Sequence, residues 1–222
     1  MDEPSAYAAL QRALCDLPCP LRLQIGNHDD RADFLAAVPD HPRGADGFID
    51  YAETVEGTRL IYLDTTTPRA HAGHFCPTRR NCLAAELKTC DRARIFVHHN
   101  VMPLGLPAED NIALIPEDHA SLARLLTQHR GRIDYIHLGH VLHSFTASMR
   151  HSLCSVRSTG NQFLLDLSKR DLLQGAPMAP SYCVIVADDA DTVIHEIPFT
   201  WDGPIFNTST AWDDWAKPVA AE

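Results

Sequence analysis

The stretch LRLQIGNHDD, residues 21–30, passes abruptly from an apolar run to glycine, asparagine, histidine and two aspartates. The apolar residues 21–25 predict a β-strand, and the polar residues after them predict a loop at its carboxyl end. Loops in this position often carry functional side chains, because the sheet holds them rigidly. In a simple turn, by contrast, Asn27 and Asp29 would bond the backbone and His28 would face solvent. The stretch alone is compatible with both interpretations.

Two later stretches repeat this pattern of a short β-rich run that ends in polar residues. They are ARIFVHHN, residues 93–100, and RIDYIHLGH, residues 132–140. The histidines at or just after these strand ends are His98, His99, His140 and His143. Imidazole nitrogen suits transition metals, and amide or carboxylate oxygen completes a site for Mn, Fe or Zn. Three such strand ends predict a site at one edge of a sheet.

The spacing of apolar residues predicts the remaining elements. Helices are expected over residues 5–17, 31–38, 79–90 and 116–129. Strands are expected over 47–54 and 58–64, and from about residue 144 the chain reads as mostly β, with strands over 144–150, 152–158, 162–168, 181–188 and 191–199. Helices that alternate with strands in the first half predict an α/β fold.

Length and charge limit the classes of protein and partner. A chain of 222 residues with 45% hydrophobic residues is expected to form one large domain. The net charge of −10 disfavours binding to a nucleic-acid polymer, which needs a basic surface. Small anionic substrates are compatible with this charge, because a bound metal ion can dominate one site.

The cysteines and the hydropathy pattern indicate the compartment. The seven cysteines are odd in number and lack the paired spacing of a zinc ribbon, so we expect small buried residues in a reducing compartment. The N-terminal MDEPSAYAAL does not resemble a signal peptide, and no run approaches the roughly 18 apolar residues of a membrane span. We therefore expect a cytoplasmic protein without a membrane partner.

The motifs GNHD, VHH and GHVLH, in this order and each after a predicted strand, resemble three blocks of the calcineurin-like metallophosphoesterase superfamily. The family's order is Asp-x-His, Gly-Asp, Gly-Asn-His-Asp/Glu, a His-bearing strand end and Gly-His-x-His. IYLDTTTP (61–68), FVHHNVMPLG (96–105) and residues 139–167 resemble the bacterial cyclic nucleotide and glycerophosphodiester phosphodiesterases. The resemblance runs from about residue 5 to residue 200.

This resemblance implies a fold and an activity. The fold would be an α/β sandwich of two mixed β-sheets flanked by helices, in a domain over residues 1–200 that a C-terminal tail, 201–222, follows. The activity would be hydrolysis of a small phosphoester, such as a 3',5'-cyclic nucleotide or a glycerophosphodiester. The cofactors would be divalent metal ions of Mn, Fe, Zn or Co, two of them in the family, which clamp the phosphoryl oxygens and activate a hydroxide.

The resemblance also assigns metal ligands. Asn27, His98 and His140 would bind one metal ion. His143 would bind the other, although GHVLH places it three residues after His140 where the family has a spacing of two. An extra residue changes the direction of a loop side chain, so either a bulge restores His143 as a ligand or that ligand is lost.

Three further residues receive roles beside the metal. The resemblance makes His28 the catalytic imidazole, which stabilises charge or protonates the leaving oxygen. Asp29 would orient His28 or its neighbours from outside the ligand set. His99 would face the substrate or the surface.

The first two family blocks are absent, because MDEPSAYAAL resembles the helix that follows the family's Gly-Asp loop. We therefore expect an N-terminally incomplete domain that lacks the first strand or strands, binds one metal ion instead of two and hydrolyses its substrate weakly. A sheet without these strands would expose backbone edges, which makes a homodimer an expected partner state. Three alternatives remain open: a truncated enzyme, a noncatalytic nucleotide- or metal-binding relic, and an unrelated α/β protein.

Overall fold

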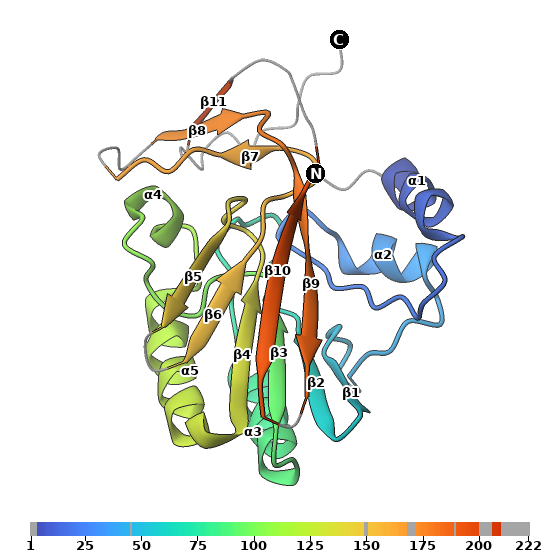
Figure 1. Cartoon of the computed structure of the whole chain (residues 1–222), viewed down its shortest axis with the longest axis vertical. Coiled ribbons are helices and arrows are strands. Elements are labelled where there is room, and N and C mark those ends of the chain that lie inside the picture. The colour runs from blue at the N-terminus through green and yellow to red at the C-terminus, as the bar shows by residue number, and fades with distance from the viewer. Residues whose placement is uncertain are drawn as a thin grey trace.

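A six-stranded mixed sheet lies at the centre of the computed structural model, with the order β1-β2-β3-β4-β6-β5 (Figure 1). The structure describes residues 4–44, 46–148, 151–167, 172–188, 190–199 and 206–209. The strands are β1 (Tyr51–Val55), β2 (Thr58–Leu63), β3 (Ala93–Val97), β4 (Ile133–Leu138), β5 (Phe145–Ser148) and β6 (Ser152–Ser155). β2, β3, β4 and β6 run parallel, whereas β1 and β5 pair antiparallel at the two edges.

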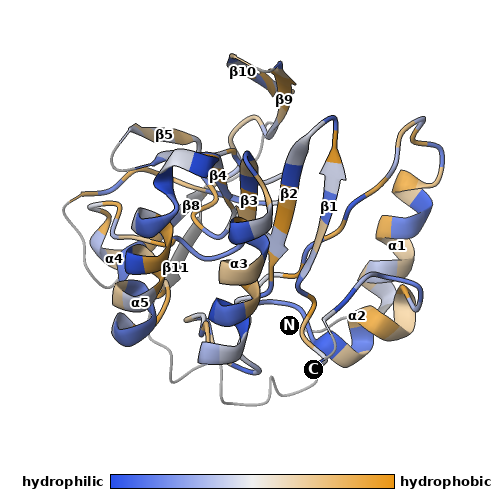
Figure 2. Ribbon diagram, turned by 90° about the horizontal axis from the view of Figure 1, so that it is seen from below, coloured by the Kyte–Doolittle hydropathy of each residue, from blue (hydrophilic) through white to orange (hydrophobic). Residues whose placement is uncertain are grey.

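Two helices cover one face of this sheet and a β-hairpin covers the other (Figures 1 and 2). The helices are α3 (Pro77–Thr89) and α5 (Pro116–Gln128), and a short 3₁₀ helix, η1 (Arg130–Arg132), follows α5. Each of the two long helices begins with proline, which fits the first turn because its missing N–H has no partner there. The hairpin consists of β9 (Ser181–Ala187) and β10 (Thr192–Pro198). The predicted α/β sandwich is therefore present, with a second β layer of two strands.

Smaller elements flank these layers. α1 (Pro4–Leu14) and α2 (Arg31–Ala37) lie beside the β1 edge, and α4 (Pro107–Asp110) lies near β5 (Figure 1). β7 (Gln162–Phe163), β8 (Leu172–Ala176) and β11 (Phe206–Ser209) form a three-stranded sheet in the order β11-β8-β7.

The alternation of side chains along the strands divides the sheet into two different faces. Ile61, Ile95 and Ile136 are buried with leucines of α3 and α5 in the main apolar core. The intervening positions stack aromatic rings across neighbouring strands, with Tyr62 and Phe96 at 4.9 Å and Phe96 and His137 at 4.7 Å between ring centroids. One face thus supplies the apolar core, and the other faces the hairpin.

Residues 21–25 belong to no β ladder, so the predicted strand is wrong. Side chains form hydrogen bonds with backbone groups that would otherwise pair with a neighbouring strand. The Leu23 carbonyl accepts a hydrogen bond from the Tyr51 hydroxyl at 2.6 Å and lies 3.0 Å from His41 Nε2. The Gln24 carboxamide donates to backbone carbonyls of β2 and β3. The segment is therefore fixed to the sheet by side chains.

The other predicted helices and strands are present with shifted ends. The predicted strand 162–168 shortens to β7, and α4 and β8 were not predicted. Residues 201–222 were assigned to a tail. Within this range, residues 206–209 form β11, which pairs antiparallel with β8, while 201–205 and 210–222 lie outside the described residues.

The prediction that the cysteines are buried is wrong for most of them, and all seven are free. Cys154 is buried, whereas Cys15, Cys19 and Cys82 are exposed. Among the residues that the structure describes, no helix is long and apolar enough to cross a membrane.

Candidate metal centre

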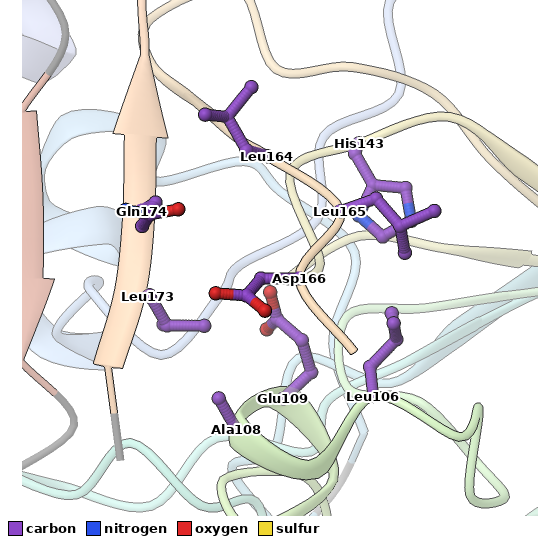
Figure 3. Close-up of a pocket in the computed structure, with 9 residues that line it drawn as sticks. All are labelled: Leu106, Ala108, Glu109, His143, Leu164, Leu165, Asp166, Leu173 and Gln174. Atoms are coloured by element: carbon purple, nitrogen blue, oxygen red, sulfur yellow. The ribbon is translucent and has the colours of Figure 1, made fainter. Parts of the chain in front are cut away.

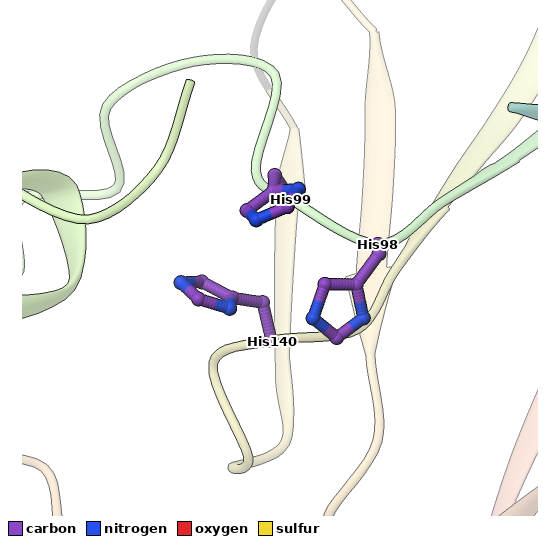
Figure 4. A group of neighbouring side chains, drawn as sticks. All are labelled: His98, His99 and His140. Carbon is purple, nitrogen blue, oxygen red and sulfur yellow. The ribbon is translucent and has the colours of Figure 1, made fainter. Parts of the chain in front are cut away.

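Three histidines meet where β3 and β4 end. His98 and His99 follow β3, and His140 follows β4 by two residues. Because β3 and β4 are parallel neighbours, their carboxyl ends lie at the same edge of the sheet. One nitrogen from each of the three rings lies within 4.8 Å of the other two (Figure 4). The sequence prediction that these strand ends converge is confirmed for this part of the site.

His140 presents a nitrogen without a protein partner. Its Nε2 is buried and makes no hydrogen bond, and a backbone hydrogen bond at Ile112 uses the other side of the ring. Burial, together with the neighbouring His99, holds the pKa of His140 well below its ordinary value. The ring is therefore neutral, so one of its nitrogens keeps a lone pair. This is the state in which imidazole binds a metal ion.

The loop after β4 places this ring through unusual backbone angles. His140 has φ +63° and Leu142 has φ +57°, both in the left-handed region that non-glycine residues rarely adopt. Such backbone conformations persist only where the surrounding structure holds them, and they cluster at functional sites. Holding His140 over the end of the sheet in this conformation therefore costs conformational energy.

His98 lies against the GNHD loop. Its Nε2 is 2.8 Å from Asn27 Oδ1, and Asn27 is buried with 6% of its surface exposed. Burial is the main reason that the pKa of His98 lies well below its ordinary value, with His99 and His140 adding to the shift. Asn27 and His98 thus present an amide oxygen and a neutral imidazole to each other, and a cation bound here would replace the shared proton.

Two glycines make room for the His98 ring. A Cβ added at Gly26 would lie 2.6 Å from His98 Cε1, and one added at Gly139 would lie 2.9 Å from His98 Nδ1. Both distances are too short for a side chain. The glycines of GNHD and GHVLH therefore have a steric role, because they allow the backbone to pass on either side of the imidazole.

His99 is buried and has partners for both ring nitrogens. Its Nδ1 is 2.7 Å from Thr65 Oγ1, and its Nε2 is 2.8 Å from the His71 carbonyl oxygen. A carbonyl only accepts, so Nε2 carries the proton and Nδ1 accepts from the threonine hydroxyl. Burial lowers the pKa of His99 to about 4. His99 therefore fastens the segment around residues 65–71 and has no spare lone pair for a metal ion.

The GNHD loop combines features of a turn and of a site. Asp29 behaves as in a turn, since its carboxylate accepts from the Gly26 N–H at 2.7 Å and from the Tyr7 hydroxyl at 2.8 Å. Asn27 does not, because its side chain faces His98 and not its own backbone. His28 is exposed at the rim of the cluster. Asp29 thus shapes the loop that presents Asn27 and His28, which is compatible with its predicted supporting role.

A buried ion pair anchors this loop to β2. Arg31 Nε is 2.6 Å from Asp64 Oδ2, and the Asp64 side chain is fully buried directly after β2. Burial would raise the pKa of Asp64, but Arg31 and backbone hydrogen bonds from Ile49 and Thr66 bring it below its ordinary value. The carboxylate is therefore charged and fixes the start of α2, four residues after Asn27.

His143 lies elsewhere. It lines a small cavity of about 10 Å³ together with Glu109 and Asp166 (Figure 3), and it is not one of the three converging histidines. Glu109 Oε2 is buried without a hydrogen-bond partner, and burial raises the pKa of Glu109 to about 8. The extra residue in GHVLH thus turns His143 away from His98 and His140, so the structure does not bring it into the ligand set.

His71 belongs to the site but was not predicted. Its Nδ1 lies 3.2 Å from Asn27 Nδ2, and its ring centroid lies 5.7 Å from that of His28. The residue sits in the long connection between β2 and α3, where no strand or motif marks it. The only sequence signal was its place a few residues after IYLDTTTP, which the resemblance had already associated with the site.

The donors present fit a divalent transition metal ion. Asn27 offers an amide oxygen, and His98 and His140 offer imidazoles whose pKa values are low enough to keep them neutral at pH 7. The structural sign is the close approach of the rings, with one nitrogen of His98 and one of His140 within 4.8 Å of each other. The buried, unpartnered Nε2 of His140 is compatible with a bound ligand.

Comparison with known proteins yields relatives of one kind. No protein-family model matches the chain. A probable cyclic nucleotide phosphodiesterase of Rhodopseudomonas palustris is 29% identical over 92% of this chain and 76% of its own length. A cAMP/cGMP dual specificity phosphodiesterase of Mycobacterium tuberculosis is 31% identical over 88% of this chain and 61% of its own. A glycerophosphodiester phosphodiesterase of Enterobacter lignolyticus is 34% identical over 50% of this chain and 41% of its own.

A solved structure shares the fold. The dimetal phosphatase from Danio rerio superposes with a TM-score of 0.56 at 15% identity, over 77% of this chain and 73% of that chain. The fold therefore matches that of an enzyme named for two metal ions. The chain spans about three quarters of the Rhodopseudomonas relative and less than two thirds of the other two relatives. These relatives, this fold and the ordered motifs at one sheet edge support the resemblance of the chain to the calcineurin-like metallophosphoesterase superfamily.

Proposed function

We propose that the chain is a metal-dependent phosphoesterase that hydrolyses a small phosphodiester, such as a 3',5'-cyclic nucleotide or a glycerophosphodiester. The observation that carries the proposal is the convergence of the His98 and His140 rings, with one nitrogen of each within 4.8 Å of the other, while His98 also contacts Asn27 Oδ1. The names of the curated relatives support the substrate class. Asn27, His98 and His140 would hold one divalent ion of Mn, Fe, Zn or Co.

Each residue has a distinct part in this proposal. When bound, the metal ion would polarise the phosphoryl group and lower the pKa of a water molecule. His28, exposed at the rim, would give a proton to the leaving oxygen. His99 keeps the adjacent loop in place through Thr65 and the His71 carbonyl. Asp29 holds the backbone turn that presents His28.

The experiment is turnover of bis(p-nitrophenyl) phosphate and of 3',5'-cyclic AMP with and without Mn²⁺. We expect activity that requires the metal ion. Replacing His28 with alanine should lower kcat by roughly 10²- to 10⁴-fold, the usual contribution of a general acid, with Mn²⁺ binding retained. The matched control is His129→Ala, because His129 follows α5 near the amino-terminal end of β4, at the opposite edge of the sheet from the cluster.

The possible outcomes separate the proposal from its alternatives. Mn²⁺ binding without turnover of either substrate would contradict the enzyme and favour the noncatalytic nucleotide- or metal-binding relic. Equal metal content in the wild type and in Asn27→Ala would favour an unrelated α/β protein.

We also propose that the chain forms a homodimer through the outer face of the β9–β10 hairpin. The register places Val186 opposite Val193 and Tyr182 opposite Ile197 on one side of this two-stranded sheet, and all four are exposed. Exposed apolar patches of this kind commonly mark interaction sites. Light scattering on a sizing column should give twice the 24.6 kDa chain mass. Val186→Asp should shift the mass to that of one chain, and a wild type that is already monomeric would contradict the proposal.

A further inference from the structure

The carboxamide of Asn27 can present either its oxygen or its nitrogen to the cluster, but only the oxygen binds a metal ion. In the structure, Oδ1 faces His98 Nε2 at 2.8 Å and Nδ2 faces His71 Nδ1 at 3.2 Å. The oxygen and the nitrogen of a carboxamide are nearly equal in shape, so a neighbouring hydrogen-bonding group must determine which of them faces His98. The question is which side chain fixes the oxygen toward His98.

We propose that His71 is the residue that orients the Asn27 carboxamide for metal binding, by accepting a hydrogen bond from its Nδ2. This inference rests on the proposed function only in taking Asn27 as a metal ligand. An imidazole nitrogen that accepts from the amide nitrogen excludes the flipped orientation, in which the amide oxygen would face the same lone pair. His71 is therefore a positioning residue and does not itself contact the metal ion.

The contact itself defines the state of the His71 ring. An amide nitrogen only donates, so His71 Nδ1 is the acceptor in this hydrogen bond and the ring proton lies on Nε2.

The position of His71 is fixed by His99, for which the sequence left a substrate-facing and a surface role open. His99 Nε2 lies 2.8 Å from the His71 carbonyl oxygen, and His99 Nδ1 lies 2.7 Å from Thr65 Oγ1. A Cβ added at Gly73 would lie 2.5 Å from His99 Nδ1, so the loop packs closely on this ring. Thr65, His99, His71 and Asn27 therefore form one hydrogen-bonded chain that ends at the metal ligand.

Outer partners of this kind usually change metal affinity by roughly 10- to 100-fold. The test is calorimetric titration of Mn²⁺ into the wild type, His71→Leu and His71→Gln. Leucine removes the acceptor, whereas the glutamine side-chain oxygen can replace it. We expect His71→Leu to weaken Mn²⁺ binding by roughly 10- to 100-fold and His71→Gln to stay within about threefold of the wild type. His129→Leu, which removes an imidazole near the amino-terminal end of β4, should have no effect.

A second measurement needs no metal ion. In the metal-free protein, the side-chain NH₂ resonances of Asn27 should shift in His71→Leu and return toward wild-type positions in His71→Gln. Unchanged resonances in His71→Leu would overturn the inference whatever the affinities are. Equal affinities in His71→Leu and the wild type would overturn it as well.

Asn27→Ala separates this inference from the proposed function. If Asn27→Ala weakens Mn²⁺ binding and His71→Leu does not, only the role of His71 is wrong. If neither variant weakens binding, the ligand assignment of Asn27 is also wrong. Thermal melting of each variant shows whether a loss of affinity comes from a loss of folded protein.

Discussion

The cluster around His98 and His140 and the cavity around Glu109 both contain a buried polar atom without a protein partner. In the first region this atom is His140 Nε2, and in the second it is Glu109 Oε2. Burial is the leading cause of the pKa shift in both, but it acts in opposite directions. It lowers the pKa of His140 far below its ordinary value and raises that of Glu109 to about 8.

This difference has a chemical consequence. Low-dielectric surroundings disfavour the charged form of any group, so a buried base loses its proton and a buried acid keeps one. His140 therefore offers a lone pair, whereas Glu109 is a neutral acid at pH 7 and holds no charge that attracts a cation. Burial thus keeps the His140 imidazole neutral and able to bind a metal ion, whereas it keeps the Glu109 carboxyl protonated.

The largest expected effect comes from removing the anchor of the histidine region. Arg31→Met would leave the buried Asp64 carboxylate with the more distant Arg79, at 3.8 Å, as its neighbouring cation. Breaking a buried ion pair costs roughly 3–5 kcal/mol of unfolding free energy. The matched control is Arg22→Met, because the Arg22 and Glu53 pair is exposed and such pairs contribute less than about 1 kcal/mol. Urea unfolding gives the unfolding free energy of both variants. Equal losses of unfolding free energy in the two would contradict the importance of the anchor.

The carboxyl region should respond to pH. The folded protein keeps Glu109 protonated up to about pH 8, while the unfolded chain ionises near its ordinary value of 4.5. The folded state then binds more protons, so this group's stabilising contribution is lost as pH rises through that window. Glu109→Gln removes the titration. Between pH 5 and pH 7 the wild type should lose about 2 kcal/mol relative to Glu109→Gln. If the free energy of unfolding changes equally with pH in the two proteins, the Glu109 carboxyl is not buried as described.

A smaller effect should come from the glycine that flanks His98. Gly26→Ala would place a methyl group 2.6 Å from the His98 ring, and overpacking of this kind costs roughly 1–3 kcal/mol. Gly131→Ala is the control, since a Cβ there would meet nothing within 4 Å. Thermal melting should show a lower Tm for Gly26→Ala alone. Equal Tm values would mean that the ring has more room than the structure gives it.

The sequence predicted the convergence of strand ends because the carboxyl ends of neighbouring parallel strands lie at the same edge of a sheet. The order of the motifs identified that edge. It did not predict the unpaired state of residues 21–25, because the bonds that Tyr51 and Gln24 make to distant backbone groups leave no local pattern. The direction of His143 depends on two left-handed residues in its loop, which spacing alone does not reveal. His71 was missed because a long connection brings it to Asn27, 44 residues away along the chain.

Residues His140 and His143 allow the most direct test, since they lie on one loop but serve the two regions compared above. Calorimetric titration of Mn²⁺ should show at least a roughly 100-fold weaker affinity for His140→Ala, the upper range for loss of a partner outside the ligand set. His143→Ala should bind Mn²⁺ within about threefold of the wild type. Equal weakening in both variants, or wild-type affinity in His140→Ala, would contradict the assignment of the metal centre to Asn27, His98 and His140.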